Sequence, residues 1–160
     1  MSTTVHSAAP ADKSTIANLV QLYLYDMTGE LPFPVGPDGR FAYDRLEAFW
    51  QHPYLIRHND ELAGFALLVD SCPITGRTPC FFMAEFFVLK AYRRRGVGRA
   101  AFEALFARYP GPWQIGVIER NRQAMAFWSR VLEDRAAGRQ RLEHEGESWL
   151  LYAFDVRSKT

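Results

Sequence analysis

Cysteine is scarce in this sequence, with two residues among 160, and no CxxC pair is present. This is too few for the disulfide framework that holds small secreted domains together, so Cys72 and Cys80 are expected to be reduced. If the segment between them folds back as a hairpin, the two could face each other, which leaves an oxidised pair as the alternative.

An excess of one charge and a long apolar run are also absent. Nineteen Lys and Arg residues balance eighteen Asp and Glu residues, for a formal net charge of +1. This balance removes the argument for a nucleic-acid or membrane partner drawn by bulk charge. No apolar run approaches the roughly 18 residues that cross a bilayer, and residues 1–12 do not resemble a secretion signal. We therefore expect a cytoplasmic protein.

Internal repeats, low-complexity tracts and Ser/Gly-rich linkers are missing as well. A chain of 160 residues buries roughly two thirds of its unfolded surface, enough for a core without a disulfide or a metal. We predict one domain over residues 1–160 and no metal site.

Apolar spacing predicts a helix over about residues 10–27. Residues 29–40 hold three prolines and three glycines, which favours a loop. The elements predicted next are a short helix at 43–51 and strands at 54–58, 61–70 and 79–89. The second and third of these strands are apolar on both faces, which is typical of central strands covered on two sides. The second half of the chain predicts, in order, a helix over 97–106, a strand over 113–117, a helix over 124–132, and strands over 139–144 and 148–156.

The most informative segment is the turn after the strand at 79–89. Gly96 and Gly98 open a helix there, and glycines at such a junction let the backbone N–H groups approach a ligand beside the positive helix end. Four arginines lie around the same turn, where they oppose the helix dipole unless an anion is bound. The turn therefore predicts a phosphate or pyrophosphate site, with a solvated basic patch as the alternative. No Walker A or dinucleotide GxGxxG pattern is present.

Two motifs resemble those of a known family. Arg93-x-x-Gly96-x-Gly98, after a strand ending near Val88, resembles the acetyl-CoA signature of the GCN5-related N-acetyltransferases, the GNAT superfamily. The segment from Val117 through Asn121, Ala124 and Phe127 to Trp128 is similar to the family's later motif. The resemblance covers about residues 4–156. It implies an α/β (α+β) fold with a mixed, mostly antiparallel central sheet of six to seven strands, about four helices on both faces, and a splay between the fourth and fifth strands.

The resemblance also implies acetyl-CoA as cosubstrate. Backbone N–H groups from about Arg94 to Arg99 would hold the CoA pyrophosphate, and the preceding strand would pair with the pantetheine arm. The residues implied in binding acetyl-CoA are Phe86, Phe87, Val88, Arg93, Arg94, Arg95, Gly96, Val97, Gly98, Arg99, Asn121 and Phe127.

Glu85 is the first candidate for the general base. It is the only charged residue between Pro79 and Leu89. Burying a carboxylate in an apolar strand costs free energy unless the group is ion-paired, hydrogen-bonded or reached by water. Such a group often has a raised pKa suited to base catalysis. Many GNAT members carry a glutamate at a similar position. The alternative is a structural carboxylate. Glu119 is the second candidate base, although it also fits a solvated loop residue.

The general acid is where the sequence departs from the family. Many members place a tyrosine after the phenylalanine of the later motif, and here Trp128 takes that position. An indole N–H does not deliver a proton, and Trp128 fits a core residue. Tyr152, on the last strand, is the tyrosine that we would test as the acid, though an apolar strand also accounts for it. Direct transfer is favoured over an acetyl-cysteine intermediate, since both cysteines are expected far from the glycine turn.

The first helix and the following loop are expected to recognise the acceptor. Tyr23, Tyr25 and Asp26, with other aromatics and acids up to Tyr43, would form an aromatic pocket for a cationic amine. The alternative is that these aromatics cap the core.

The leading prediction is an acetyl-CoA-dependent N-acetyltransferase that moves the acetyl group directly to a primary amine of a small molecule or peptide. The alternative is a non-catalytic acyl-CoA-binding or regulatory module. Nucleic-acid binding through the arginines is disfavoured by the balanced charge. Related proteins often dimerise through late strands, so a homodimer is also considered.

Overall fold

In the part of the chain that the structure describes, seven strands form one sheet in the order β1-β2-β3-β4-β5-β7-β6. The computed structural model describes residues 2–135 and 137–158, so the two ends of the predicted domain, as well as Ala136, lie outside the described residues. The strands are β1 (Thr3–Ser7), β2 (His52–His58), β3 (Glu61–Val69), β4 (Phe81–Val88), β5 (Gly111–Ile118), β6 (Gly138–His144) and β7 (Glu147–Val156). The α-helices are α1 (Lys13–Met27), α2 (Val97–Arg108) and α3 (Arg122–Val131).

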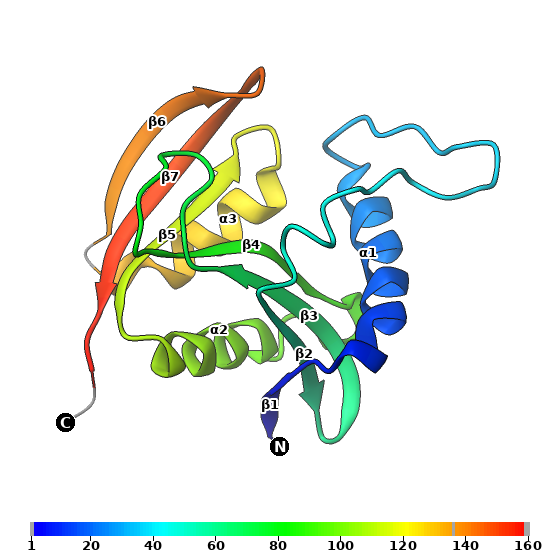
Figure 1. Ribbon diagram of the computed structural model, residues 1–160, viewed down its shortest axis with the longest axis horizontal. Helices are drawn as coiled ribbons and strands as arrows, with labels where there is room; N and C mark the ends of the chain where they lie inside the picture. Colours follow the sequence, from blue (N-terminus) through cyan, green and yellow to red (C-terminus); the bar gives the residue numbers. More distant parts are fainter. Residues whose placement is uncertain (1, 136, 159–160) are drawn as a thin grey trace.

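The helices cover both faces of the sheet (Figure 1). On one face, the apolar side of α1 packs against β2, β3 and β4 in a cluster of Ile16, Leu19, Val20, Leu24, Leu55, Phe65, Leu67 and Phe87. On the other face, α2 and α3 pack on the sheet through Ala101, Phe102, Leu105, Phe106, Trp128 and Val131. The prediction that both middle strands are covered on two sides is confirmed for β3, in which seven of nine residues are buried, whereas in β4 four of eight are buried.

The sheet is mostly antiparallel, as expected. Only β4 and β5 run parallel, and every other neighbouring pair of strands is antiparallel. Between β3 and β4 the register shifts, since Leu67 faces Glu85 and Leu68 faces Met83. Ala84 is therefore the extra residue of a β-bulge next to Glu85. Bulges re-aim side chains, and they are frequent beside functional sites.

The elements differ from the predictions in two places, a helix that is absent and a strand that was not foreseen. Residues 43–51 do not form a helix, because the only backbone hydrogen bonds within this stretch are two turn bonds, to the carbonyls of Arg45 and Glu47. A stretch this short has little helical stability of its own, and here its apolar side chains pack separately onto the α1 cluster. β1 was not predicted, since Val5 is its only buried residue. The described residues contain three α-helices rather than about four, with short 3-10 turns between other elements.

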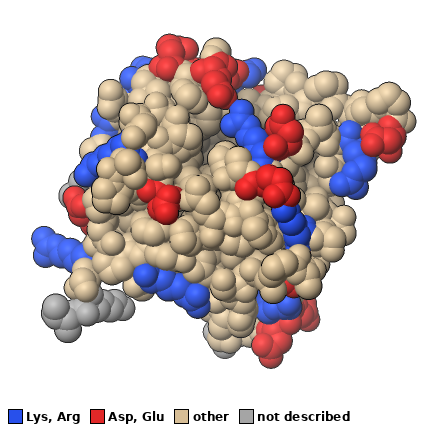
Figure 2. Space-filling view, in the orientation of Figure 1, with Lys and Arg blue, Asp and Glu red and all other residues tan. Residues whose placement is uncertain are grey.

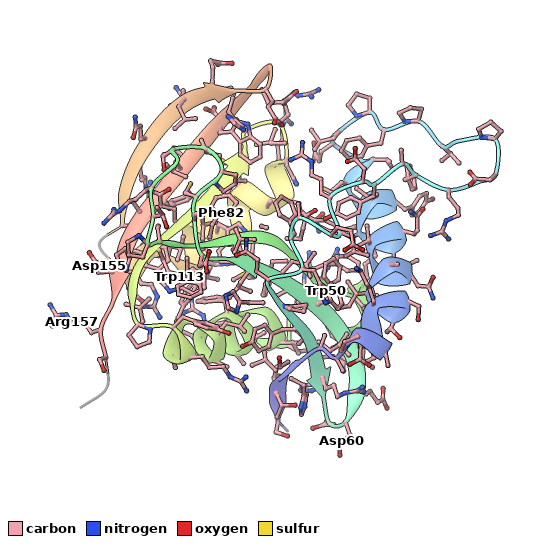
Figure 3. All side chains as sticks on the ribbon, viewed as in Figure 1. Trp50, Asp60, Phe82, Trp113, Asp155 and Arg157 are labelled. Atoms are coloured by element: carbon pink, nitrogen blue, oxygen red, sulfur yellow. The ribbon has the colours of Figure 1, made fainter. Side chains whose placement is uncertain are left out.

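Charged side chains of both signs lie on the surface, and large aromatic side chains lie inside the fold. Lys and Arg alternate with Asp and Glu on the face shown in Figure 2, without a large area of one charge. Figure 3 shows Phe82 and Trp113 inside the fold, at the point where β4 and β5 meet, whereas Asp60 lies at the periphery in the β2–β3 turn. No helix in the described part of the chain is long and apolar enough to cross a membrane.

Candidate active site

The gap between β4 and β5 is the central feature of the site. These two strands pair only at Phe81–Trp113 and Phe82–Gln114. Beyond those pairs, β4 continues along β3 to Val88 and β5 continues along β7 to Ile118. The two strands therefore splay apart, as expected. Past Phe82, the edge of β4 that faces β5 is open to main-chain pairing with an extended ligand.

The turn that follows β4 leads into α2 with two residues in the left-handed region. Arg94 has a φ of 62° and Gly96, the residue before the helix, has a φ of 77°. Among the described residues, no side chain caps the start of α2. The first N–H groups of this helix are therefore available to an anion, at the positive end of the helix dipole. Arg94, Arg95 and Arg99 are exposed around them.

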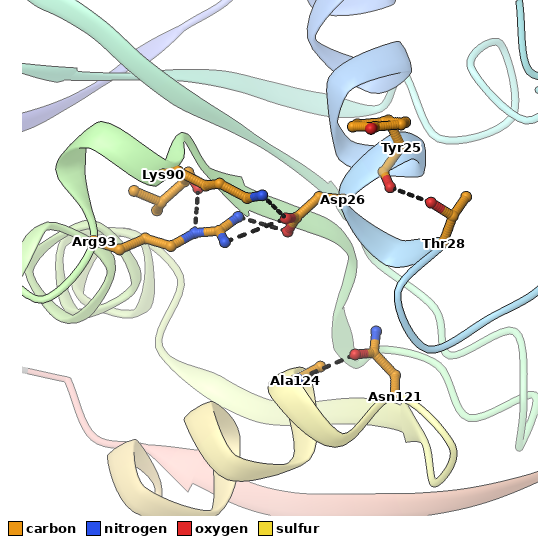
Figure 4. A network of polar contacts seen from close by, with 8 residues as sticks. Tyr25, Asp26, Thr28, Lys90, Arg93, Asn121 and Ala124 are labelled. Atoms are coloured by element: carbon orange, nitrogen blue, oxygen red, sulfur yellow. Dashed lines mark hydrogen bonds and ion pairs between the residues drawn. The ribbon is translucent and has the colours of Figure 1, made fainter.

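Gly98 packs closely against the ring of Phe127. A Cβ atom at this position would lie 3.0 Å from two ring atoms of Phe127. The Phe127 ring stacks on Phe86 of β4, with ring centroids 5.9 Å apart, and so connects α3 to the strand beside the gap. Asn121 begins α3, and its Oδ1 accepts a hydrogen bond from the Ala124 N–H at 3.2 Å (Figure 4). The residues of the later motif thus form the α3 wall beside β4.

Arg93 and Asp26 pair with each other. Two N–H groups of the Arg93 guanidinium donate to the two Asp26 oxygens, at 2.7 and 3.4 Å, and the Arg93 Nε donates to the Val88 carbonyl at 2.9 Å. Lys90 Nζ lies 3.5 Å from Asp26 Oδ1. Figure 4 shows this network joining the end of α1 to the turn after β4. Arg93, which was expected to bind the cosubstrate, and Asp26, which was expected to bind the acceptor, therefore form an ion pair with each other in this structure.

Glu85 lies on the α1 face of β4 between two tyrosines. Tyr23 of α1 donates to its Oε1 at 3.1 Å, and Tyr43 of the following loop donates to its Oε2 at 2.7 Å. Burial raises the pKa of Glu85 to about 7, against the opposing effect of both hydrogen bonds and of the Arg45 charge. Burial also raises the pKa of each tyrosine, and the Glu85 charge adds to this effect. Both hydroxyls therefore stay protonated and act as donors.

The other two predicted catalytic residues have different surroundings. Glu119 accepts hydrogen bonds from Arg141 and Ser148, and the bond from Arg141 contributes most to holding its pKa below the ordinary value. Tyr152 is fully buried in the cluster beneath α2 and α3, on the face of the sheet opposite α1. Its hydroxyl has no hydrogen-bond partner within residues 2–135 and 137–158, and Arg139 lies over its ring. The structure does not bring either residue to Glu85.

The remaining predicted positions are placed as follows. Trp128 is buried and packs on Phe86, in agreement with a core role. Tyr25 is 67% exposed and borders a hollow of about 270 Å³ between α1 and the end of β4, lined also by Leu22, Asp26, Phe87, Leu89 and Lys90. Cys72 and Cys80 are both buried and are not joined by a disulfide.

Sequence reasoning placed Tyr43 only in a general aromatic pocket and missed its contact with Glu85. It also missed Arg45, which donates to Glu145 in the β6–β7 turn at 3.0 Å. The alternation of Phe41, Tyr43 and Arg45 is the signal that could have found them. An extended segment places alternate side chains on one side, but the helix predicted over 43–51 hid this pattern.

Comparison with known proteins supports the geometry. The family model described as "Acetyltransferase (GNAT) family" matches residues 19–133. The chain therefore belongs to the GNAT family of acetyltransferases. A comparison with curated protein sequences finds no match.

Three solved structures illustrate the shared fold. The GNAT-family acetyltransferase from Streptococcus agalactiae has a TM-score of 0.68 at 14% identity, covering 98% of this chain and 96% of that one. The histone acetyltransferase HPA2 and related acetyltransferase from Corynebacterium glutamicum gives 0.67 at 18% identity, with coverages of 100% and 99%. The acetyltransferase yncA from Salmonella typhimurium, in complex with its cofactor acetyl-CoA, gives 0.65 at 14% identity, with coverages of 99% and 96%.

Proposed function

We propose that this acetyltransferase moves an acetyl group from acetyl-CoA directly to a primary amine of a small molecule or peptide. The observation that carries the proposal is the open edge of β4 beside Glu85. One edge of the strand offers main-chain groups to an extended cosubstrate, and a carboxylate with a pKa of about 7 lies on the same strand. The yncA structure, of the same fold, contains acetyl-CoA.

The residues around the turn fit the cosubstrate. The uncapped N–H groups at the start of α2, with exposed Arg94, Arg95 and Arg99, supply donors and positive charge for a pyrophosphate. The main chain of Phe86–Val88 suits the amides of the pantetheine arm. Asn121 and Phe127 form the opposite wall. We assign Arg93 to holding the turn through Asp26 rather than to contacting phosphate.

When bound, acetyl-CoA supplies the thioester carbon that the amine attacks. A primary amine resembles the lysine side chain, whose pKa is about 10.4, so most of it is protonated at neutral pH and cannot attack. Glu85 accepts a proton from the ammonium group, and its pKa of about 7 suits a base that works near neutrality. Glu119 is less suited to this role because the hydrogen bond from Arg141 holds its pKa below the ordinary value, whereas the pKa of Glu85 is raised.

No described tyrosine occupies the usual position of the general acid, and Tyr152 is fully buried. A thiol has a pKa of about 8.5, so its thiolate is a tolerable leaving group near neutral pH. We therefore assign its reprotonation to solvent. The acceptor approaches from the α1 side, where Tyr23, Tyr43 and the hollow beside Tyr25 surround Glu85 and the end of β4.

Two experiments test this function. Calorimetry should detect binding of acetyl-CoA to the purified protein, and its absence would refute the cosubstrate assignment. Thiol release should then be followed with a broad panel of primary amines for the wild type, Glu85→Gln and the control Glu143→Gln, which alters an exposed carboxylate on β6. We expect turnover by the wild type and the control and a loss of at least tenfold in Glu85→Gln. Binding without turnover of any amine would instead favour the non-catalytic acyl-CoA-binding module.

A further inference from the structure

A segment without regular secondary structure crosses the α1 face of the sheet beside Glu85. Residues Phe41–Arg45, which we call the 41–45 strap, follow the proline-rich loop, and Figure 1 shows this cyan segment running from beside α1 toward the centre of the sheet. The Phe41 backbone exchanges two hydrogen bonds with the Gln21 amide of α1, at 2.8 and 2.9 Å. Tyr43 reaches Glu85, and Arg45 reaches Glu145 in the β6–β7 turn.

Alternate residues of the strap therefore contact three separate parts of the fold. Tyr43 and Arg45 make these contacts through their side chains, whereas Phe41 makes its contact through the main chain. The strap is tied to α1 before Tyr43 and to the β6–β7 turn after it. The Tyr43 hydroxyl lies between these two contacts, of which the Arg45–Glu145 pair is largely exposed.

Groups from α1, from the strap and from β3 face the Glu85 carboxylate. Tyr23 reaches it from α1, and the strap brings Tyr43 and the charge of Arg45. From the sheet it faces Leu67 of β3, which is apolar. Each oxygen accepts one tyrosine hydroxyl, which uses about two of the four lone-pair sites of a carboxylate and leaves the others for an acceptor N–H.

We propose that Tyr43 and Tyr23 are positioning residues that fix the Glu85 carboxylate, one hydroxyl to each oxygen, and that the Arg45–Glu145 pair holds the strap in the position this requires. This inference rests on the proposed function in that Glu85 is the base of the acetyl transfer. A fixed carboxylate presents its free lone pairs in one direction, and small errors in such a geometry are costly to catalysis. Both hydroxyls donate to the ionised form, so removing either one increases the proton affinity of Glu85.

The direct test is a ¹³C NMR titration of the full chain labelled at the glutamate carboxyl carbon. The Glu85 signal is assigned by its loss in Glu85→Gln. The wild-type signal should titrate with a midpoint near 7. In Tyr43→Phe and in Tyr23→Phe, the midpoint should lie about 1 pH unit higher, as expected for the loss of one hydrogen bond to a charged group.

The matched control is Tyr92→Phe. The Tyr92 hydroxyl donates to Glu61, a carboxylate at the surface end of β3, so this variant removes the same kind of bond elsewhere. The Glu85 midpoint should not change in this control. Circular dichroism shows whether each variant is folded, and two separate tyrosines keep the test decisive if one variant fails to fold. An unchanged Glu85 midpoint in a folded Tyr43→Phe or Tyr23→Phe would overturn the assignment for that residue.

Glu145→Gln tests the anchoring of the strap. Loss of a distant negative charge would by itself lower the Glu85 midpoint, whereas release of the strap and of Tyr43 would raise it. We expect it to rise toward the value of Tyr43→Phe. A lower or unchanged midpoint would overturn the anchoring role of the Arg45–Glu145 pair.

Failure of this inference and failure of the proposed function are distinguishable, because the titration needs no substrate. Absence of acetyl transfer by the wild type would refute the function while the titration still reported the hydrogen bonds. If an amine from the panel is acetylated, Tyr43→Phe should lower kcat at pH 7 and recover part of it at pH 9. Calorimetric affinity for acetyl-CoA should stay at the wild-type value, and a loss of affinity with unchanged kcat would contradict positioning.

Discussion

Replacing Asp26 with asparagine should destabilise the protein by about 2 kcal/mol, because Asp26 joins α1 to the turn after β4. The side chains of Asp26 and Arg93 are 15% and 25% exposed. A fully exposed pair contributes about 0–1 kcal/mol, and breaking a fully buried pair costs about 3–5 kcal/mol. This pair lies between these limits.

Two further effects bear on the size of the loss. Asp26 is in the last turn of α1, where a negative charge opposes the helix dipole by about 0.5 kcal/mol, and asparagine relieves that cost. In the other direction, both oxygens of Asp26 accept hydrogen bonds from Arg93. Asparagine replaces one of these oxygens with an NH2 group, so one Arg93 N–H then faces a donor instead of an acceptor. A net loss of about 2 kcal/mol corresponds to a decrease in Tm of about 4–8 °C for a chain of this length.

The assay is urea unfolding of Asp26→Asn, Arg93→Met and the double variant. We expect a coupling free energy of about 1–2 kcal/mol between the two positions, as for residues in direct contact. Lys90→Met is the control, because Lys90 is 75% exposed and lies 3.5 Å from Asp26, so its loss should cost less than about 0.5 kcal/mol. Additive effects of Asp26→Asn and Arg93→Met would refute the pairing of these residues in solution.

Three other predictions follow from the site. Gly98→Glu should abolish calorimetric binding of acetyl-CoA and also lower Tm, because its Cβ meets the Phe127 ring; retained affinity in a folded variant would place the phosphate site elsewhere. The pKa of Glu85 is higher in the folded than in the unfolded protein, so its contribution to stability is present at low pH and is lost as pH rises toward about 7. Measured by urea unfolding against Glu85→Gln, the wild type should lose about 3 kcal/mol of relative stability between pH 4 and pH 8, and a constant difference would contradict the raised pKa. Tyr152→Phe removes a buried hydroxyl without a partner, so Tm should stay the same or rise and turnover should be retained; a loss of turnover comparable to that of Glu85→Gln would implicate Tyr152 in the chemistry.

The turn after β4 could be predicted from the sequence because its signals are local. Gly96 adopts a positive φ, and Gly98 lies at the start of the helix that follows. The helices were equally visible, since their apolar residues recur at helical spacing. The prediction that β4 splays from β5 rested only on the family resemblance. No pattern in the two strand sequences indicates that pairing stops at Gln114.

The parts that could not be predicted depend on contacts between distant segments. Arg93 and Asp26 are 67 positions apart, and their charges alone suggested separate ligands. The same holds for Tyr43 and Glu85, which are 42 positions apart and come together only because the 41–45 strap crosses the sheet. β1 was missed for another reason, since a five-residue edge strand with one buried side chain has almost no hydrophobic pattern.

The most direct test of the central claim is transfer of a ¹³C-labelled acetyl group, followed by mass spectrometry of both the amine panel and the protein. With the wild type, the label should appear on a primary amine and not on Cys72 or Cys80, and Glu85→Gln should slow its appearance at least tenfold at pH 7. Label on a cysteine, or equal rates for the wild type and Glu85→Gln, would contradict direct transfer with Glu85 as the base.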